Sequence, residues 1–437
     1  EVAAAQGSTT LHITTRQEFQ VHDLALAHVI PVLRALLPAG LSSRGGGGNT
    51  VRNIMVSPEA GVAVDEVFDP SPHAFALTER LIAESDSWSL PRKLKIAFAA
   101  SAADTVRARF NDLGFIATLD QGRRGFRVLV AGGMGGKAAV GRELEPFIPE
   151  EDVYLVATAI KRLFDRHGNR KNRNTARLRF LWRSLGEQGF RHLYQQERTA
   201  VQAENPAPLV LPETADTPAP PPTPAAALVE EEPGFWRWYR RAVEPQRQPG
   251  RVSVLVPVRL GNLPVRAALA LADFLEPLGP DTVRASLGQN LRLRHLPTAA
   301  LPGLWRLLQT VLPETHDWPR LMAHAIACTG ADTCKLGICL PKGALRAIEQ
   351  ALLASGLDLD AIPEFQLSLS GCPNSCGQHP LADLGFFGNA GRRDGALYPA
   401  YAVTAGARAT GEAARFGLSF GRVPAKHLPR LVVEVVH

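Results

Sequence analysis

Four cysteines in two spaced pairs carry the clearest chemistry in this sequence. Cys328 and Cys334 form a C-x5-C pair, and Cys372 and Cys376 form a C-x3-C pair. Four thiolates are the ligand set of a cubane iron–sulfur cluster, whereas structural zinc sites usually carry the shorter C-x2-C spacing. The glycines and prolines around both pairs suit a backbone that wraps closely around a cluster. The spacing predicts a [4Fe–4S] site, with four buried structural cysteines as the alternative.

Composition narrows the class of protein. Cys339 is the fifth cysteine, and an odd number gives no disulfide framework, so we expect a reducing, cytoplasmic setting. No apolar run reaches the length of a membrane span, about 18 residues. The net charge of +6 favours an anionic ligand or partner, and no nucleic-acid-binding motif accompanies it. We therefore expect neither a nucleic acid nor a membrane as partner.

The residues around the cysteines extend the pattern. The sequence reads A-C-T-G-A-D-T-C at 327–334, G-C-P-N-S-C-G at 371–377 and A-D-L-G-F-F-G at 382–388. These segments resemble the sulfite/nitrite reductase family, whose members carry a siroheme joined to a [4Fe–4S] cluster. The resemblance implies that all four paired cysteines hold the cluster and that Cys376 also bridges to the siroheme iron. It implies an α+β fold of two pseudo-symmetric halves, with mixed and antiparallel sheets and ferredoxin-like α/β units around a central cofactor site.

The same resemblance assigns basic and amide side chains to the cofactor and the substrate. Siroheme is rich in carboxylates, and a small oxyanion also needs converging cations. The positions that match the family's siroheme contacts are Arg16, Gln20, Arg177 and Asn374. The positions that match the cations around the substrate are Arg52, Lys93 and Lys95. A surface charge is the alternative for each single basic residue.

The substrate is inferred from the K-x-K segment. Lys93 and Lys95 flank Leu94 in an expected strand, so both ammonium groups should project from one face, bind an oxyanion and donate protons. Sulfite reductases resemble this chain in having K-x-K, whereas nitrite reductases usually show K-x-N. We therefore expect six-electron reduction of sulfite to sulfide in sulfur assimilation. The residues that flank the cysteines also resemble those of nitrite reductases, so reduction of nitrite to ammonia is the alternative.

Electrons are expected from a separate donor. The sequence shows no flavin or nicotinamide motif. By analogy with the family, the donor is a ferredoxin or a flavoprotein reductase. Two further readings stay open: a cluster-binding electron carrier without siroheme, and a non-catalytic fragment or assembly subunit.

The elements that must position these residues are predicted to repeat. D-L-G-F occurs at 112–115 and again at 383–386, and the segments that begin at Pro91 and Pro363 also correspond. Echoes at nearly one offset indicate two related halves. We predict a first half at 1–202, a proline-rich linker at 203–234 and a second half at 235–437, the latter made of a ferredoxin-like unit at 250–325 and a cluster- and siroheme-binding unit at 326–437.

Local patterns place the basic residues on strands, loops and a helix end. The expected segments are a strand over 11–22, a glycine-rich loop over 43–53, a strand over 89–99, a helix over 150–165 and a basic run over 167–179.

The two predicted halves begin differently. The second half shows a strand at 251–258, a helix at 264–278 and a strand at 282–293, and the first half shows only the last of these. We therefore expect that an amino-terminal segment of the family, which supplies another active-site arginine, is missing. His12 stands where relatives often carry a further arginine.

Overall fold

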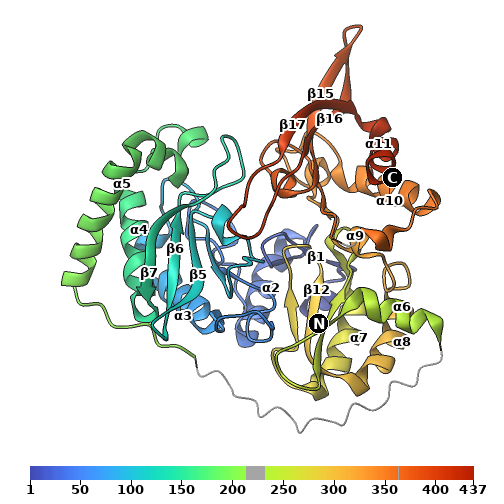
Figure 1. Ribbon diagram of the computed structural model, residues 1–437, viewed down its shortest axis with the longest axis horizontal. Coiled ribbons are helices and arrows are strands. Elements are labelled where there is room, and N and C mark those ends of the chain that lie inside the picture. Colours follow the sequence, from blue (N-terminus) through green and yellow to red (C-terminus); the bar gives the residue numbers. More distant parts are fainter. Residues whose placement is uncertain (213–231, 363) are drawn as a thin grey trace. The chain divides into compact units, whose positions relative to one another are not determined.

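The computed structural model describes residues 1–212, 232–362 and 364–437 (Figure 1). Most of the predicted linker, at 213–231, and Pro363 of the predicted repeat lie outside the described residues. The chain divides into two compact units. Unit 1 contains the described parts of 1–41, 218–409 and 415–437, and unit 2 contains those of 42–217 and 410–414.

Unit 2 is built on a five-stranded mixed sheet of order β3-β4-β5-β6-β7. β3, β4 and β5 are parallel, and β6 and β7 continue the sheet antiparallel. All of β4 is buried, as is usual for a strand that pairs on both sides in a covered parallel sheet. The strands are β3 (Met55–Val56), β4 (Ile96–Ala99), β5 (Leu113–Asp120), β6 (Arg123–Val130) and β7 (Arg142–Pro149).

Three long helices complete the core of unit 2. They are α3 (Ser71–Ala83), α4 (Val153–His167) and α5 (Leu178–Ala203). In α4, Val156, Ile160 and Leu163 recur at helical spacing and are fully buried against the sheet, and α5 packs beside α4. The helix predicted at 150–165 is therefore confirmed. No helix in the described residues is long and apolar enough to cross a membrane.

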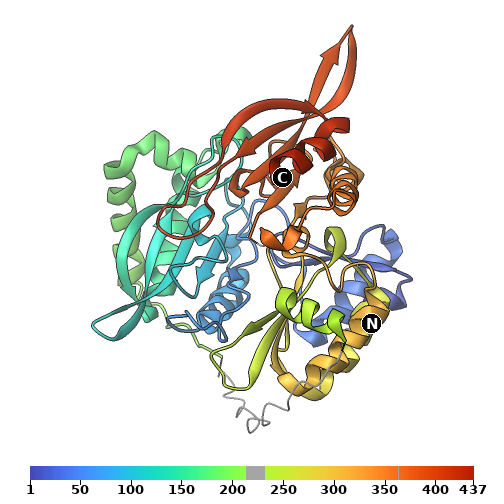
Figure 2. The same cartoon turned by 45° about the vertical axis from the view of Figure 1, so that its right-hand side comes forward.

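Unit 1 contains a second five-stranded sheet of the same design, in the order β13-β14-β15-β16-β17. β13, β14 and β15 are parallel, and β16 and β17 are antiparallel additions. The hairpin of β15 and β16 extends beyond the other strands of its sheet (Figures 1 and 2). The elements are β13 (Ile326–Ala327), β14 (Leu367–Ser370), β15 (Leu384–Arg393), β16 (Ala396–Ala405) and β17 (Leu418–Pro424), with α9 (Arg320–Ala323), α10 (Pro341–Ala354) and α11 (Leu428–Val436).

The predicted pseudo-symmetry is confirmed by the register of these two sheets. β3, β4 and β5 begin at Met55, Ile96 and Leu113, and β13, β14 and β15 each begin 271 residues later, at 326, 367 and 384. The D-L-G-F motif repeats at the same offset because its aspartate accepts an equivalent backbone hydrogen bond in both sheets. Asp112 accepts a hydrogen bond from the backbone N–H of Lys95 at 2.9 Å, and Asp383 accepts one from Gln366 at 2.8 Å.

The remainder of unit 1 is a ferredoxin-like α/β arrangement. A sheet of order β11-β12-β9-β8 and a sheet of order β10-β1-β2 share one apolar core with three of the helices, α6 (Pro233–Ala242), α7 (Val265–Leu275) and α8 (Leu301–Val311). The strands are β8 (Val243–Pro245), β9 (Arg251–Val256), β10 (Asn262–Pro264), β11 (Val283–Ala285), β12 (Leu291–Pro297), β1 (Thr10–Ile13) and β2 (Phe19–Gln20), and the other helices are α1 (Val2–Ala5) and α2 (Val29–Leu36).

Residues 1–41 belong to unit 1, whereas the predicted division placed them in one half with 42–202. The reason is strand pairing: β1 pairs antiparallel with β10, with Thr10 opposite Pro264. The predicted strand and helix at 251–258 and 264–278 are found as β9 and α7.

Two predicted strands are wrong because each is a hairpin. Residues 11–22 form β1, a turn and β2, and residues 282–293 similarly contain β11, a turn and the start of β12. Gln17 and Gln289 occupy the left-handed region in these turns, with φ of 62° and 61°. Each glutamine side chain donates a hydrogen bond to the backbone of the other hairpin. Gln17 Nε2 donates to the Ala285 carbonyl at 3.2 Å, and Gln289 Nε2 donates to the Ile13 carbonyl at 3.1 Å. The hairpins are therefore a second pseudo-symmetric pair.

Candidate cofactor and substrate sites

The two cysteine pairs lie on loops that leave neighbouring parallel strands. Cys328 directly follows β13, and Cys372 follows β14, with Ala327 opposite Leu369 in the sheet. Carboxyl ends of adjacent parallel strands open at the same edge of a sheet, which is where α/β folds place their sites. The Cys328 N–H donates to the Leu369 carbonyl at 3.2 Å, and the Gly371 N–H donates to Cys328 Sγ at 3.2 Å. The loops are thereby joined at their first cysteines.

Glycines let the two cysteine loops approach each other. A Cβ on Gly371 would lie 2.5 Å from Gly330 Cα, and a Cβ on Gly388 would lie 2.2 Å from the Gly371 carbonyl oxygen. Gly330 also has φ of 56°, which favours glycine. A residue with a Cβ atom at Gly371 or Gly388 therefore cannot be accommodated without moving the backbone.

Cys339 joins the two cysteine loops through backbone hydrogen bonds, and its thiol is itself hydrogen-bonded to backbone carbonyls. Its N–H donates to the Gly371 carbonyl at 3.0 Å, and its carbonyl accepts from the Ala331 N–H at 2.9 Å. Its buried Sγ donates to the carbonyls of Asn389 and Ala400, both at 3.4 Å. This position suits a structural role, as expected for the cysteine outside the two pairs.

A serine and a histidine order the backbone after Cys376. The Ser370 hydroxyl accepts from the Gly377 N–H at 3.0 Å and lies 2.9 Å from His379 Nδ1. Burial lowers the pKa of His379 to about 3, so its ring is neutral. Sequence reasoning missed both residues, because neither has a spacing that indicates a role.

Neighbouring thiols influence the ionisation of Cys328 and Cys372. Burial raises the pKa of Cys328 to about 11, and the nearby Cys376 and Cys372 raise it further. Burial also raises the pKa of Cys372, with added contributions from Cys376 and Cys334. In the described part of the chain, no three His, Cys, Asp or Glu side chains converge on a single metal ion. A cubane places each thiolate on a different iron, and its positive irons stabilise the thiolates that burial disfavours.

A buried hydroxyl beside the cysteines also fits a cluster. Tyr401 is 1% exposed, and its hydroxyl has no hydrogen-bond partner among the described residues. Burial raises its pKa, and the neighbouring Cys339 and Cys328 contribute. An unsatisfied buried hydroxyl costs about 1–3 kcal/mol, so an acceptor such as a cluster sulfur is chemically apt at this place.

The β1–β2 hairpin brings Arg16 to the second cysteine loop. Thr15 Oγ1 donates to the Cys376 carbonyl at 2.9 Å, and Gln378 Nε2 donates to the Thr15 carbonyl at 3.3 Å. Arg16 follows Thr15 in this turn and is partly exposed. The predicted cofactor residue is therefore next to the predicted ligand loop.

Two other predicted siroheme contacts also lie in unit 1. Gln20 is exposed on β2, with its Oε1 3.0 Å from His22 Nε2. Asn374 is exposed between Cys372 and Cys376. Both side chains are open to a ligand on the surface of this unit.

The three predicted substrate cations lie together in unit 2. Val51 and Leu94 form a parallel bridge, and the Arg52 N–H donates to the Leu94 carbonyl at 2.9 Å. Leu94 is fully buried, whereas Lys93 and Lys95 are partly exposed, as alternation predicts. The regular strand is shorter than the predicted 89–99, because β4 begins only at Ile96.

Arg177, the fourth siroheme candidate, is bound to an aspartate of unit 2. Its Nε and Nη2 donate to the two carboxylate oxygens of Asp112 at 3.2 and 2.6 Å. Asp112 is completely buried and also accepts the Lys95 N–H. Arg177 is thereby linked to the K-x-K segment. The repeated D-L-G-F motif was the signal that could have revealed Asp112.

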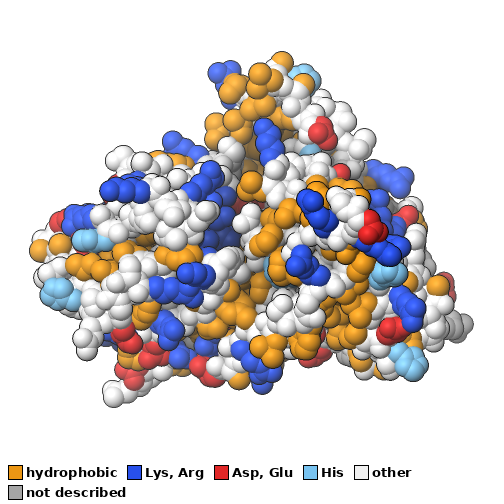
Figure 3. Space-filling model, turned by 90° about the horizontal axis from the view of Figure 1, so that it is seen from above, with side chains coloured by type: hydrophobic (Ala, Val, Ile, Leu, Met, Phe, Trp, Pro, Cys, Tyr) orange, Lys and Arg blue, Asp and Glu red, His pale blue; other side chains and the backbone are white. Residues whose placement is uncertain are grey.

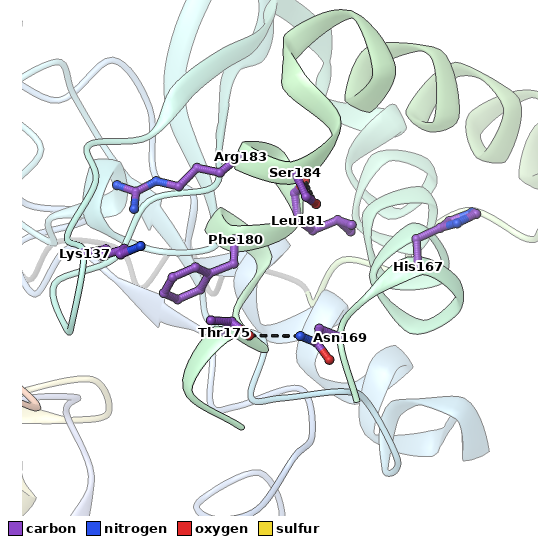
Figure 4. Close-up of a pocket in the computed structure, with 8 residues that line it drawn as sticks. All are labelled: Lys137, His167, Asn169, Thr175, Phe180, Leu181, Arg183 and Ser184. Atoms are coloured by element: carbon purple, nitrogen blue, oxygen red, sulfur yellow. Dashed lines mark hydrogen bonds between the residues drawn. The ribbon is translucent and has the colours of Figure 1, made fainter. Parts of the chain in front are cut away.

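Unit 2 also contains a small pocket of about 390 Å³ beside the start of α5 (Figure 4). Asn169 Nδ2 donates to Thr175 Oγ1 at 2.9 Å on its wall. Basic side chains also predominate over acidic ones on the face shown in Figure 3. The residues that line the pocket are Lys137, His167, Asn169, Thr175, Phe180, Leu181, Arg183 and Ser184.

Comparison with known proteins gives two family matches. The Nitrite/Sulfite reductase ferredoxin-like half domain matches residues 1–39 and 244–311, which the structure joins through β1 and β10. The Nitrite and sulphite reductase 4Fe-4S domain matches residues 47–202. That second segment contains no cysteine, so the paired cysteines belong to the other copy of the repeated sheet.

Individual relatives cover most of the chain. A ferredoxin–nitrite reductase of Synechococcus elongatus is 31% identical over 398 residues, which are 89% of this chain and 72% of the relative. An assimilatory ferredoxin-dependent nitrite reductase of Haloferax mediterranei is 27% identical over 442 residues, covering 98% of this chain and 72% of the relative. The structure of Mycobacterium tuberculosis NirA matches all of this chain and 76% of its own, with a TM-score of 0.83 and 25% identity.

The chain is an α+β oxidoreductase and belongs to the nitrite and sulfite reductase family. A [4Fe–4S] cluster and a siroheme are the cofactors of this family. The residues present fit both: two cysteine pairs on glycine-packed loops for the cluster, and Arg16, Gln20 and Asn374 on the same unit for the carboxylate-rich siroheme.

Proposed function

We propose that this chain reduces nitrite to ammonium, using six electrons from a ferredoxin. The observation that supports this substrate best is the identity of 31% to a ferredoxin–nitrite reductase over 89% of the chain. The overall reaction consumes one nitrite, six electrons and eight protons, and releases one ammonium ion and two waters. This choice reverses the expectation of sulfite drawn from the K-x-K segment.

The residues of unit 2 would bind the oxyanion and supply protons. Arg52, Lys93 and Lys95 are partly exposed cations carried by backbone segments that are hydrogen-bonded to each other. Converging cations stabilise negative charge on the substrate, and each ammonium can donate a proton as an oxygen leaves as water. Asp112 and Arg177 hold the Lys95 segment in place.

The residues of unit 1 would hold the redox cofactors. Cys328, Cys334, Cys372 and Cys376 would hold the cluster, and Cys376 would also hold the siroheme beside it, as the family resemblance implies. When bound, the cluster and the siroheme supply one-electron transfer and an iron that binds the substrate. The hydrogen bond from Thr15 to the Cys376 carbonyl keeps Arg16 beside that loop.

Sulfite is the second candidate, and Lys95 is the observation that favours it. Sulfite must lose three oxygens on the way to sulfide, so a second ammonium group is of greater use to it. In both cases we propose a cytoplasmic enzyme, with no nucleic acid or membrane partner.

The decisive experiment compares both substrates on one preparation. Protein purified without oxygen is examined for the visible absorption of siroheme and for four irons in the cluster, and then kcat/KM is measured for nitrite and sulfite with a chemical reductant. A higher kcat/KM for nitrite supports the proposal. A higher value for sulfite would replace it by sulfite reduction, and normal iron content without siroheme would favour the electron-carrier reading. Reduced ferredoxin in place of the chemical reductant then tests the donor.

A further inference from the structure

A lysine that is neither a proposed cofactor contact nor a proposed substrate cation is buried beside the cysteine loops. Lys342 is the second residue of α10, which begins two residues after Cys339, and it is 8% exposed. Its Nζ donates to Asn262 Oδ1 at 2.9 Å and lies 3.4 Å from His12 Nδ1. In the described part of the chain, no ion pair joins Lys342 to a carboxylate. A buried ammonium without an adjacent counter-charge is costly, so its retention calls for an explanation.

The polar neighbours of Lys342 are neutral. Asn262 Oδ1 can only accept hydrogen bonds, so His12 Nδ1, at 3.0 Å, must carry a proton and donate it. Burial lowers the pKa of His12 to about 4, and the charge of Lys342 contributes. The histidine is therefore neutral at pH 7, and the positive charge of this group of three side chains resides on Lys342.

The charged groups around Lys342 include one of the proposed cluster ligands. Burial lowers its pKa, Asp332 raises it, Arg346 lowers it, and Cys328 raises it. The amino-terminal turn of α10, which carries Lys342, adds positive potential at the same end of the helix. Lys342 and Arg346 therefore bring two positive charges to this end of α10, against one negative charge on Asp332.

We propose that the ammonium group of Lys342, held by its hydrogen bond to Asn262 and lying beside the neutral His12, is a positioned positive charge that raises the reduction potential of the cluster. This inference rests on the proposed cluster ligation. A cubane with four thiolates is a net anion, and reduction makes it more negative by one charge. A fixed cation in a medium of low dielectric constant favours the more negative state, whereas an exposed one is screened by water.

The test is a redox titration followed by electron paramagnetic resonance, with iron and sulfide analysis of each variant. Lys342→Met keeps the length and the apolar stem but removes the charge, and we expect a more negative midpoint potential with the iron content retained. Asn262→Asp is nearly isosteric and places a carboxylate against the ammonium, so it should shift the potential in the same direction. Lys335→Met is the matched control, because Lys335 is exposed and adjoins Cys334, and it should cause a smaller shift.

Each contrary outcome has a distinct meaning. An unchanged midpoint in Lys342→Met with full iron content overturns the inference, and so does loss of siroheme without a shift. If Lys342→Met loses iron, the iron content of Lys342→Gln and Lys342→Arg decides between charge and packing. Iron retained in Lys342→Arg but not in Lys342→Gln supports a requirement for the positive charge. Iron lost from both variants overturns the inference and indicates that Lys342 acts through packing. Absence of iron in the unmodified chain would contradict the proposed function itself.

Discussion

The loop after β4 in unit 2 and the loop after β14 in unit 1 have the same backbone and different chemistry. Asp104 and Arg107 have φ of 54° and 59° in the first loop, and Ser375 and Gln378 have φ of 61° and 62° at the equivalent positions of the second. The Arg107 N–H donates to the Asp104 carbonyl at 2.9 Å, and the Gln378 N–H donates to the Ser375 carbonyl at 3.0 Å. The left-handed turns of the cysteine loop are therefore a property of the repeat and need no cluster.

The likeness extends to the first cysteine. Ser57 accepts a hydrogen bond from the Ala100 N–H at 3.2 Å, just as Cys328 accepts one from Gly371 at 3.2 Å. At the offset of 271, the four cysteines correspond to Ser57, Ala63, Ser101 and Thr105. One scaffold thus holds four thiols in unit 1 and three hydroxyls and a methyl group in unit 2, and what differs is the side-chain chemistry at the loop positions.

The largest effect is expected from Cys376→Ser. Loss of a ligand thiolate should abolish turnover and alter the cluster and siroheme spectra, whereas Thr105→Ala, at the equivalent position of unit 2, should leave the spectra unchanged. Absorption spectra and iron content measure both. Cys339→Ser is a second control and should retain its iron; loss of iron there with retention in Cys376→Ser would show that the ligand assignment is wrong.

Asp112→Asn should destabilise the protein more than Asp383→Asn. Asp112 is buried and pairs with Arg177, and removal of one partner of a buried ion pair costs about 3–5 kcal/mol. Asp383 is exposed and its carboxylate accepts the Gln366 N–H, so its loss should cost about 1 kcal/mol. Urea denaturation gives both values, and equal losses would remove the difference between the two copies of D-L-G-F.

Lys95→Asn should reduce sulfite turnover more than nitrite turnover. One charge-assisted contact in the transition state is worth about 2–4 kcal/mol, and sulfite, with three oxygens to lose, depends more on it. The measurement is kcat/KM for both substrates, with Lys171→Asn as a control for removal of an exposed charge from unit 2. Equal losses on both substrates would mean that Lys95 does not discriminate between them.

The smallest effect concerns pH and compares Asp104 with its counterpart Ser375. Burial raises the pKa of Asp104 to about 6 from 3.8, although the N–H groups of Arg109 and Ala108 oppose the shift. The folded chain therefore holds this proton to a higher pH than the unfolded chain, and the free energy of unfolding falls as pH rises from about 4 to about 6. Asp104→Ser, which copies the other loop, should remove up to about 3 kcal/mol of this dependence. Urea denaturation at pH 4.5 and pH 7 measures it, and an unchanged slope would show that Asp104 titrates normally.

Much of the site was predictable because its signals are local. Cysteine spacing indicates a cluster whatever the rest of the chain does, and the recurrence of D-L-G-F indicates two copies of one sheet. The alternation of Lys93, Leu94 and Lys95 also held, because neighbouring residues in an extended chain must face opposite sides.

Other features were decided by tertiary structure. The sequence over 11–22 looks like one strand, but a glutamine in the left-handed region and pairing with β10 convert it into a hairpin that joins unit 1. The sequence around Arg177 does not identify its ion-pair partner, because Asp112 lies 65 residues away in the chain. Lys342, Asn262 and His12 are likewise scattered along the sequence and meet only when β1 pairs with β10 beside α10. Spacing within a segment fixes which atoms a loop can offer, whereas long-range strand pairing fixes which charges are buried together, and burial sets the free energy of those charges.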